Sequence, residues 1–124
     1  MSRDVVEKFV KDLLMAWQVR DKEKLTQMYC KEVVGYMDDK VVHYDDIMNR
    51  VQFSINKFKE VSNEIKDLII EGHKAVARIK QTLIPREEGK PTIYHLTSIY
   101  YVKNHQVVET WSSFYPNINY LKND

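Results

Sequence analysis

The first half of the chain changes from helical spacing of apolar residues to strand-like runs and back. Residues 3–18 carry apolar side chains at spacings of three and four, which predicts an amphipathic helix. Asp21 is placed to cap a second, short helix that runs to about Tyr29. The segment EVVGYMDDKVVHY predicts two short strands around an MDDK turn, in which Gly35 indicates a bulge or a close approach. A third helix is expected from Asp45 or Asp46 to about Lys59.

The second half has the alternation and composition of β-strands. EVSNEIKDLIIEG predicts a first long strand, and Gly72 with His73 predicts the hairpin turn after it. Three further runs are rich in β-branched and aromatic residues: KAVARIKQTLI, TIYHLTSIYYV and QVVETWSSFY. The closing letters NYLKND are expected to form a tail. With helices early and an antiparallel sheet late, the order of elements predicts an α+β fold.

Composition and charge limit the class of protein. The 124 residues are expected to form a single domain, 1–124, of ordinary globular composition. A net charge of +1 gives no electrostatic case for nucleic acid or for an acidic membrane. Cys30 is the only cysteine, and no apolar run reaches the length of a membrane span, so a cytoplasmic protein is expected. No histidine or carboxylate motif indicates a metal, and no cofactor is expected.

Three stretches carry a resemblance to a known family. They are VRDKEKLTQMY, YDDIMNRVQFSI and HQVVETWSSFYP, and together they span nearly the whole chain. The sequence is similar to the nuclear transport factor 2-like superfamily, and within it to the SnoaL-like and ketosteroid-isomerase-like proteins. The resemblance implies a strongly curved antiparallel sheet wrapped around the N-terminal helices, with a cone-shaped pocket between them. Members include enzymes and binding domains, so the fold alone does not decide the function.

The catalytic sets of two enzyme groups in that superfamily are not reproduced here. At the three positions of the isomerase set, the chain has Leu13, Met37 and Ser98 in place of a tyrosine and two acids. At the positions of the epoxide hydrolase set it has Arg78, Lys80 and Ser112, so both carboxylates are missing. Whether the chain is an enzyme therefore stays open; any isomerase, cyclase, lyase or hydrolase activity would need other acid–base residues.

Two candidate catalytic residues remain. Asp38 follows the position of the isomerase base, and His43 lies near it in the sequence, so they are candidates for an acid–base pair. The alternative is that His43 is an ordinary strand residue with a satisfied hydrogen bond.

The resemblance also implies a set of ligand contacts on the concave face of the sheet. These are Arg78, Lys80, Ser98, Tyr100, Thr110, Ser112 and Phe114. Arg78 and Lys80 would then receive an anionic group. The alternative places both cations on the solvated face, because Ala77, Ile79 and Leu83 make the opposite face of that strand apolar. Trp17 is expected to pack in the core at the end of the first helix, with a ligand contact as the other possibility.

The opposite face of the closing strands is expected to contact a partner. Ile99, Tyr101, Glu109 and Trp111 share that face, and the resemblance implies a homodimer through it. Two functions follow. One is a SnoaL-like small-molecule pocket protein that binds or transforms a moderately apolar, anionic metabolite. The other is a non-catalytic interaction or dimerisation domain of the same fold.

Overall fold

The computed structural model describes residues 1–116. Its helices and strands are α1 (Arg3–Val19), α2 (Lys22–Met28), β1 (Tyr29–Met37), β2 (Lys40–His43), α3 (Tyr44–Lys57), β3 (Phe58–Glu71), β4 (Lys74–Pro85), β5 (Thr92–Lys103) and β6 (Gln106–Tyr115). This is the order that the sequence predicts, with small shifts at the element ends. The NYLKND stretch that was expected to be a tail lies outside the described residues.

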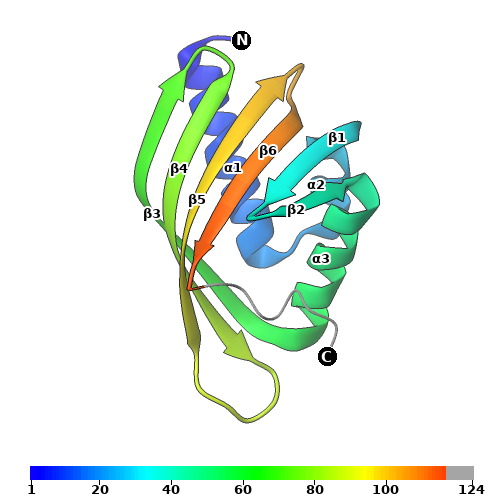
Figure 1. The fold of residues 1–124 in the computed structure, drawn as a ribbon, viewed down its shortest axis with the longest axis vertical. Coiled ribbons are helices and arrows are strands. Elements are labelled where there is room, and N and C mark those ends of the chain that lie inside the picture. Colours follow the sequence, from blue (N-terminus) through cyan, green and yellow to red (C-terminus); the bar gives the residue numbers. More distant parts are fainter. Residues whose placement is uncertain (117–124) are drawn as a thin grey trace.

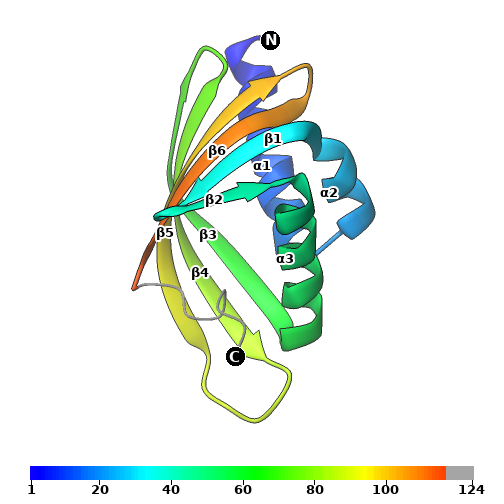
Figure 2. The ribbon, with the colours of Figure 1, turned by 45° about the vertical axis from the view of Figure 1, so that its right-hand side comes forward.

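The six strands form one curved sheet in the order β2-β1-β6-β5-β4-β3. Its hollow side faces the helices, with α1 crossing it and α2 and α3 on the same side (Figures 1 and 2). The α+β fold is therefore confirmed. One detail differs from the expectation, because β1 runs parallel to β6 while the other pairs are antiparallel. The α3 connection carries the chain from the β2 edge to the far edge, which makes this parallel pairing possible.

Local signals in the sequence explain where the helices begin. The side chain of Ser2 accepts a hydrogen bond from the Val5 backbone nitrogen at 3.3 Å, and Asp21 does the same for Lys24 at 3.1 Å. At the start of α3, the carboxylate of Asp46 accepts from the backbone nitrogen of His43 at 2.8 Å. None of the described helices is both long enough and apolar enough to cross a membrane.

Gly35 on β1 marks a close approach, as its place in the sequence predicts. A Cβ atom there would lie 2.6 Å from a methyl carbon of Val42 and 3.1 Å from the methyl of Thr110. These neighbours belong to the strands on either side of β1. Glycine therefore lets β2 and β6 pack against the two sides of β1 at this point.

The strand register assigns the two faces of the sheet and corrects one expectation. Ala77 pairs with Ser98 and Ile79 pairs with Leu96, so these four side chains share the buried, hollow face. The residues between them point the other way. The outer face of β4 carries Val76, Arg78, Lys80 and Thr82. The concave position of Arg78 and Lys80 that the resemblance implies is therefore wrong, and the alternative on the solvated face is the one observed, because Ala77, Ile79 and Leu83 form the buried face.

Candidate functional site

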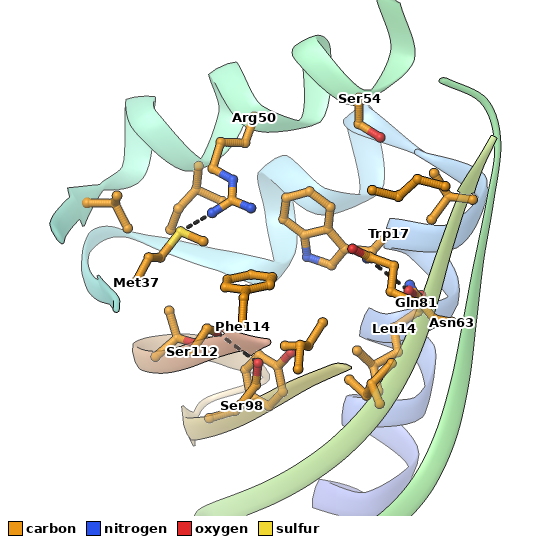
Figure 3. Close-up of a pocket in the computed structure, with 18 of the residues that line it drawn as sticks. Leu14, Trp17, Met37, Arg50, Ser54, Asn63, Gln81, Ser98, Ser112 and Phe114 are labelled. Atoms are coloured by element: carbon orange, nitrogen blue, oxygen red, sulfur yellow. Dashed lines mark hydrogen bonds between the residues drawn. The ribbon is translucent and has the colours of Figure 1, made fainter. Parts of the chain in front are cut away.

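A cavity lies between the hollow face of the sheet and helices α1 and α3 (Figure 3). It has a volume of about 100 Å³. That is room for a small organic ligand. Most of the wall is apolar, with Leu14, Met37, Ile47, Val61, Ile79, Leu83, Leu96 and Phe114 among its side chains.

Three aromatic side chains in this wall, Trp17, Tyr29 and Tyr100, carry polar atoms. The indole Nε1 of Trp17 donates to the hydroxyl oxygen of Tyr29 at 2.9 Å. Burial raises the pKa of Tyr29 well above its usual value, and the nearby phenol of Tyr100 adds to the rise, against the Trp17 hydrogen bond and the charge of Arg50. Burial also raises the pKa of Tyr100, opposed by the hydroxyl of Ser98 and by Arg50. Both phenols therefore stay protonated at neutral pH and can donate hydrogen bonds.

Two serines from neighbouring strands form a second polar group. The hydroxyls of Ser98 and Ser112 lie 2.8 Å apart and are hydrogen-bonded to each other (Figure 3). Ser98 is 1% exposed. The Ser98 hydroxyl is also hydrogen-bonded to the phenol of Tyr100. The hydroxyls of β5 and β6 therefore form a connected polar strip within the apolar wall.

Arg50 on α3 contributes a positive charge to the cavity wall. The guanidinium of Arg50 lies 5.8 Å above the ring centre of Phe114, and its Nη1 contacts the Met37 sulfur (Figure 3). Its charge reaches the two buried phenols, since it lowers the pKa of both Tyr29 and Tyr100. Arg50 is half-buried and lines the cavity, so the cavity is apolar but has one cationic wall.

A pair of amides forms the polar part of the wall beside α1. The Nε2 of Gln81 on β4 donates to the Oδ1 of Asn63 on β3 at 3.0 Å. Asn63 is held to α1 twice, because its backbone nitrogen donates to Gln18 Oε1 at 2.9 Å and its Nδ2 donates to the Leu14 carbonyl at 3.4 Å. In Figure 3 this pair lies beside Trp17, away from Arg50 and Met37. Arg50 and the amide pair therefore lie in different parts of the cavity wall.

Solved structures share this architecture across almost the whole chain. AclR from Streptomyces galilaeus, described as a candidate hydroxylase, superposes with a TM-score of 0.83 at 20% identity, covering 97% of this chain and 80% of its own. IdmH from Streptomyces antibioticus, described as a candidate polyketide cyclase, gives 0.78 at 15% identity and 89% and 91% coverage. A protein of unknown function from Burkholderia pseudomallei, described as nuclear transport factor 2-like, gives 0.75 at 15% identity and 92% coverage of each chain. The fold is nuclear transport factor 2-like.

That result confirms the resemblance at the level of the fold. No family model matches the chain, and no curated protein matches its sequence. At 20% identity or less, the structural likeness gives the arrangement of helices and sheet and leaves the chemistry to the residues of this chain.

Within this nuclear transport factor 2-like fold, most of the expected contact residues do face the cavity. The side chains that line it include Trp17, Ser98, Tyr100, Thr110, Ser112 and Phe114. Trp17 packs against the core, as expected, and it also lines the cavity, where a ligand contact stays a prediction.

The two expected catalytic residues lie elsewhere. Asp38 is exposed in the β1–β2 turn, where its backbone nitrogen donates to the Ser112 carbonyl at 2.9 Å. Its carboxylate accepts from the Phe114 backbone nitrogen at 3.3 Å, which ties the turn to β6. His43 is exposed at the other end of the hairpin, opposite Val34 and roughly 10 Å along the strand. The expected acid–base pair is therefore not formed, because the two residues are at opposite ends of β2.

Arg78 and Lys80 also lie outside the cavity. Arg78 is exposed on the outer face and bonds Asp67 on the neighbouring strand at 2.7 Å. Lys80 is directly opposite Glu64 on β3 and His95 on β5. Neither cation lines the cavity, so the charge that faces a ligand there is that of Arg50.

The sequence contained a signal for both overlooked polar residues. Ile47, Arg50 and Ser54 recur at spacings of three and four, which places Arg50 on the apolar, inward face of α3. Gln81 falls between Ile79 and Leu83 in the buried alternation of β4. A polar residue inside an apolar periodicity is the pattern that indicates both positions.

The described cavity wall supplies hydrogen-bond donors and a positive charge, but not the carboxylate or imidazole groups of a conventional acid–base site. Among the described residues that line it, none is an aspartate, glutamate or histidine. Across residues 1–116, no three histidine, cysteine, aspartate or glutamate side chains are grouped closely enough to hold a metal ion. The geometry suits binding and polarising an anionic or carbonyl oxygen.

Proposed function

We propose that the chain is a small-molecule pocket protein that holds a moderately apolar, anionic metabolite in the cavity, and that binding is its main task. The observation that carries the proposal is the guanidinium of Arg50 in a mostly apolar cavity. A charged side chain in such a wall interacts more strongly with a carboxylate or enolate than it would in water. Apolar walls with a few convergent polar groups are typical of ligand sites.

The proposed ligand contacts come from both layers of the fold. Arg50 receives the anionic oxygen, and the hydroxyl strip of Ser98 and Ser112 lies on the sheet side. Trp17, Tyr100, Thr110 and Phe114 complete the set. The descriptions of AclR and IdmH as a candidate hydroxylase and cyclase support a small organic molecule as the ligand.

If the protein also transforms its ligand, we propose an electrophilic role for the cavity. The protonated phenols of Tyr29 and Tyr100 and the charge of Arg50 would stabilise negative charge that develops on a ligand oxygen. The proton that leaves a carbon atom in such a step would pass to water or to a basic group of the ligand itself, because the described cavity wall holds no carboxylate or imidazole.

Titration of isotope-labelled protein with cinnamate, an apolar carboxylate, tests the proposal. The expected result is saturable binding in which the largest amide shifts belong to cavity residues such as Ser98, Thr110 and Ser112. The side-chain Nε signal of Arg50 should shift as well. Shifts confined to the outer face, or the absence of saturable binding by any apolar anion, would contradict the proposal.

The outer face of the sheet supports a second proposal, a homodimer. One row of directly paired side chains crosses all six strands on this face: Ile69, Val76, Ile99, Trp111, Tyr36 and Val41. Of these, Ile69, Val41 and Trp111 are 61%, 55% and 44% exposed. An apolar row that is exposed at both ends and at Trp111 is a typical contact surface.

Trp111 lies near the middle of this row and is held in place. Its ring stacks on Tyr36 with centroids 3.9 Å apart, and its Nε1 donates to the carboxylate of Glu109 at 2.8 Å. The polar atom of the indole is thus satisfied within the chain, and the exposed part of the ring is apolar. Charges lie on both sides of the row, with Lys74 and Glu71 on one side and the Arg78–Asp67 pair on the other. Opposite charges on a two-fold symmetric face can pair with those of a second copy.

Sedimentation velocity over a range of concentrations tests the homodimer. We expect the wild-type chain to sediment as a dimer and Trp111→Glu to sediment as a monomer, because a carboxylate would then be buried in the apolar row. Val19→Glu is the matched control, since Val19 is also exposed but lies on α1. A monomeric wild type at millimolar concentration, or an unchanged Trp111→Glu dimer, would contradict the proposal.

A further inference from the structure

The amide network beside α1 fixes the orientation of the Gln81 side-chain amide. The Leu14 carbonyl can only accept a hydrogen bond, so the Asn63 side chain must turn its nitrogen toward α1. The Asn63 oxygen then faces Gln81 and can only accept. Gln81 must therefore present its own nitrogen to Asn63, as it does at 3.0 Å. Each orientation follows from the one before it, starting at a backbone carbonyl that cannot be reversed.

This chain of orientations leaves one atom without a partner. The Oε1 of Gln81 is buried and accepts no hydrogen bond in the structure. Gln81 belongs to the cavity wall, and its side chain is labelled beside Trp17 in Figure 3. A buried acceptor without a donor costs about 1–3 kcal/mol. The amide cannot relieve that cost by turning over, because its nitrogen would then leave Asn63.

We propose that Gln81 is a specificity-determining residue that accepts a hydrogen bond from a donor group of the ligand. The inference rests on the proposed function and makes it more specific, because it adds a second polar group to the ligand. Arg50 and Met37 lie in one part of the cavity and Gln81 and Asn63 in another, with the rings of Trp17 and Phe114 between them (Figure 3). The ligand class is therefore an elongated, largely apolar molecule with an anionic oxygen at one end and a hydroxyl or N–H group at the other.

Three carboxylates of nearly the same shape separate the effects of the two ends. Para-hydroxycinnamate carries the donor, cinnamate lacks it, and para-methoxycinnamate keeps the oxygen without the proton. Isothermal titration calorimetry should give para-hydroxycinnamate an affinity about tenfold higher than that of the other two, the ratio that corresponds to about 1.4 kcal/mol. Equal affinities of all three for the wild-type protein would overturn the inference.

Variants of Gln81 assign the preference to this residue. Gln81→Leu keeps the approximate volume and removes the acceptor, so the preference for the hydroxyl should fall to about onefold while cinnamate still binds. Gln81→Glu keeps an acceptor, so both ligands should bind more weakly but the preference should remain. Gln52→Leu is the matched control, because Gln52 lies on α3 outside the cavity wall and should keep the wild-type ratio.

The outcomes distinguish this inference from the function on which it rests. Cinnamate binding with no preference for the hydroxyl, or a preference that survives in Gln81→Leu, overturns the role of Gln81 and leaves the anionic pocket in place. Failure of all three carboxylates to bind overturns both. Circular dichroism of each variant, together with its cinnamate affinity, shows whether the cavity is intact. A Gln81→Leu protein that binds neither cinnamate nor para-hydroxycinnamate would overturn the inference as well. Gln81 would then be required for ligand binding in general and not specifically for recognition of the hydroxyl.

Discussion

The two faces of the sheet differ in how polar and apolar side chains are arranged, and neighbouring residues of a strand belong to opposite faces. Ser112 lies in the cavity wall and bonds Ser98, whereas Ser113 is exposed on the outside. Gln81 faces the cavity, whereas Lys80 lies among the outer charges. On the hollow side, polar groups bond each other inside an apolar wall. On the outer side, an apolar row lies between exposed charges.

The environment of each face determines how strongly an arginine there interacts with an anionic group. The Arg78–Asp67 ion pair is more than half exposed, so it contributes about 0–1 kcal/mol. Arg50 lies among buried aromatic and apolar side chains. Water screens its charge less there, so the guanidinium interacts more strongly with another charged group. Ligand recognition is therefore expected on the hollow side, and association between copies on the outer side.

The largest expected contrast concerns two isoleucines. Ile79 on the hollow face is 1% exposed, so Ile79→Ala should lower the free energy of unfolding by about 2–5 kcal/mol. Ile93 on the outer face is 45% exposed, and Ile93→Ala should change it by no more than about 0.5 kcal/mol. Urea denaturation measures both. Similar losses for the two variants would mean that the faces are assigned wrongly.

Two arginines provide the next contrast. Arg50→Met should weaken cinnamate binding by about 1.5–3 kcal/mol, roughly tenfold to a hundredfold, because the cavity loses its cation. Binding of the neutral analogue cinnamyl alcohol should change much less. Arg78→Met should leave both affinities unchanged, since Arg78 lies outside the cavity. Calorimetry that finds the larger loss in Arg78→Met would reverse our placement of the anion contact.

A smaller effect is expected at Gly35, where the side chains of β2 and β6 pack closely against β1. Gly35→Ala should cost about 1–3 kcal/mol of stability, because the new methyl would meet Val42 at 2.6 Å and Thr110 at 3.1 Å. Gly89→Ala, in the exposed β4–β5 connection, should be close to neutral, since its Cβ would meet only Pro85 at 3.4 Å. Thermal unfolding of the pair measures the difference; equal melting temperatures would mean that β1 can shift without cost.

The smallest expected effect appears only at alkaline pH. Burial raises the pKa of Tyr29 in the folded protein, so the unfolded chain loses its proton first and the stabilising contribution fades as pH rises above about 10. Stability should fall by about 1.4 kcal/mol per pH unit from this residue. Tyr29→Phe should remove that part of the slope, and Tyr115→Phe, at a site 76% exposed, is the control. Denaturation at several alkaline pH values would contradict the assignment if both variants kept the wild-type slope.

The sequence predicted the element order well, for a local reason. Apolar spacing, the cap at Asp21 and the turn at Gly72 act over a few residues, and the structure places the elements accordingly. Which face of a strand is buried is harder to predict when both alternating sets look plausible. On β4 the family resemblance favoured the wrong set, although the apolar residues Ala77, Ile79 and Leu83 indicated the right one.

The candidate site was only partly predictable because it combines distant segments. The resemblance, together with the alternation of side chains along the strands, placed Ser98, Tyr100, Thr110 and Ser112 on the cavity side. The periodicity of α3 indicates that Arg50 faces inward, but its position over Phe114 depends on how that helix packs against the sheet. The orphaned oxygen of Gln81 depends on hydrogen bonds that link α1, β3 and β4, and these appear only once the fold is assembled.

The most direct test of the central claim compares the two neighbouring serines. Ser112→Phe places a ring in the cavity, and Ser113→Phe places the same ring on the outer face. Calorimetry with para-hydroxycinnamate should show an affinity loss of about tenfold or more for Ser112→Phe, and near wild-type affinity for Ser113→Phe. If Ser112→Phe binds as well as the wild type, or if Ser113→Phe is the variant that loses binding, the ligand does not occupy the hollow face and the account is wrong.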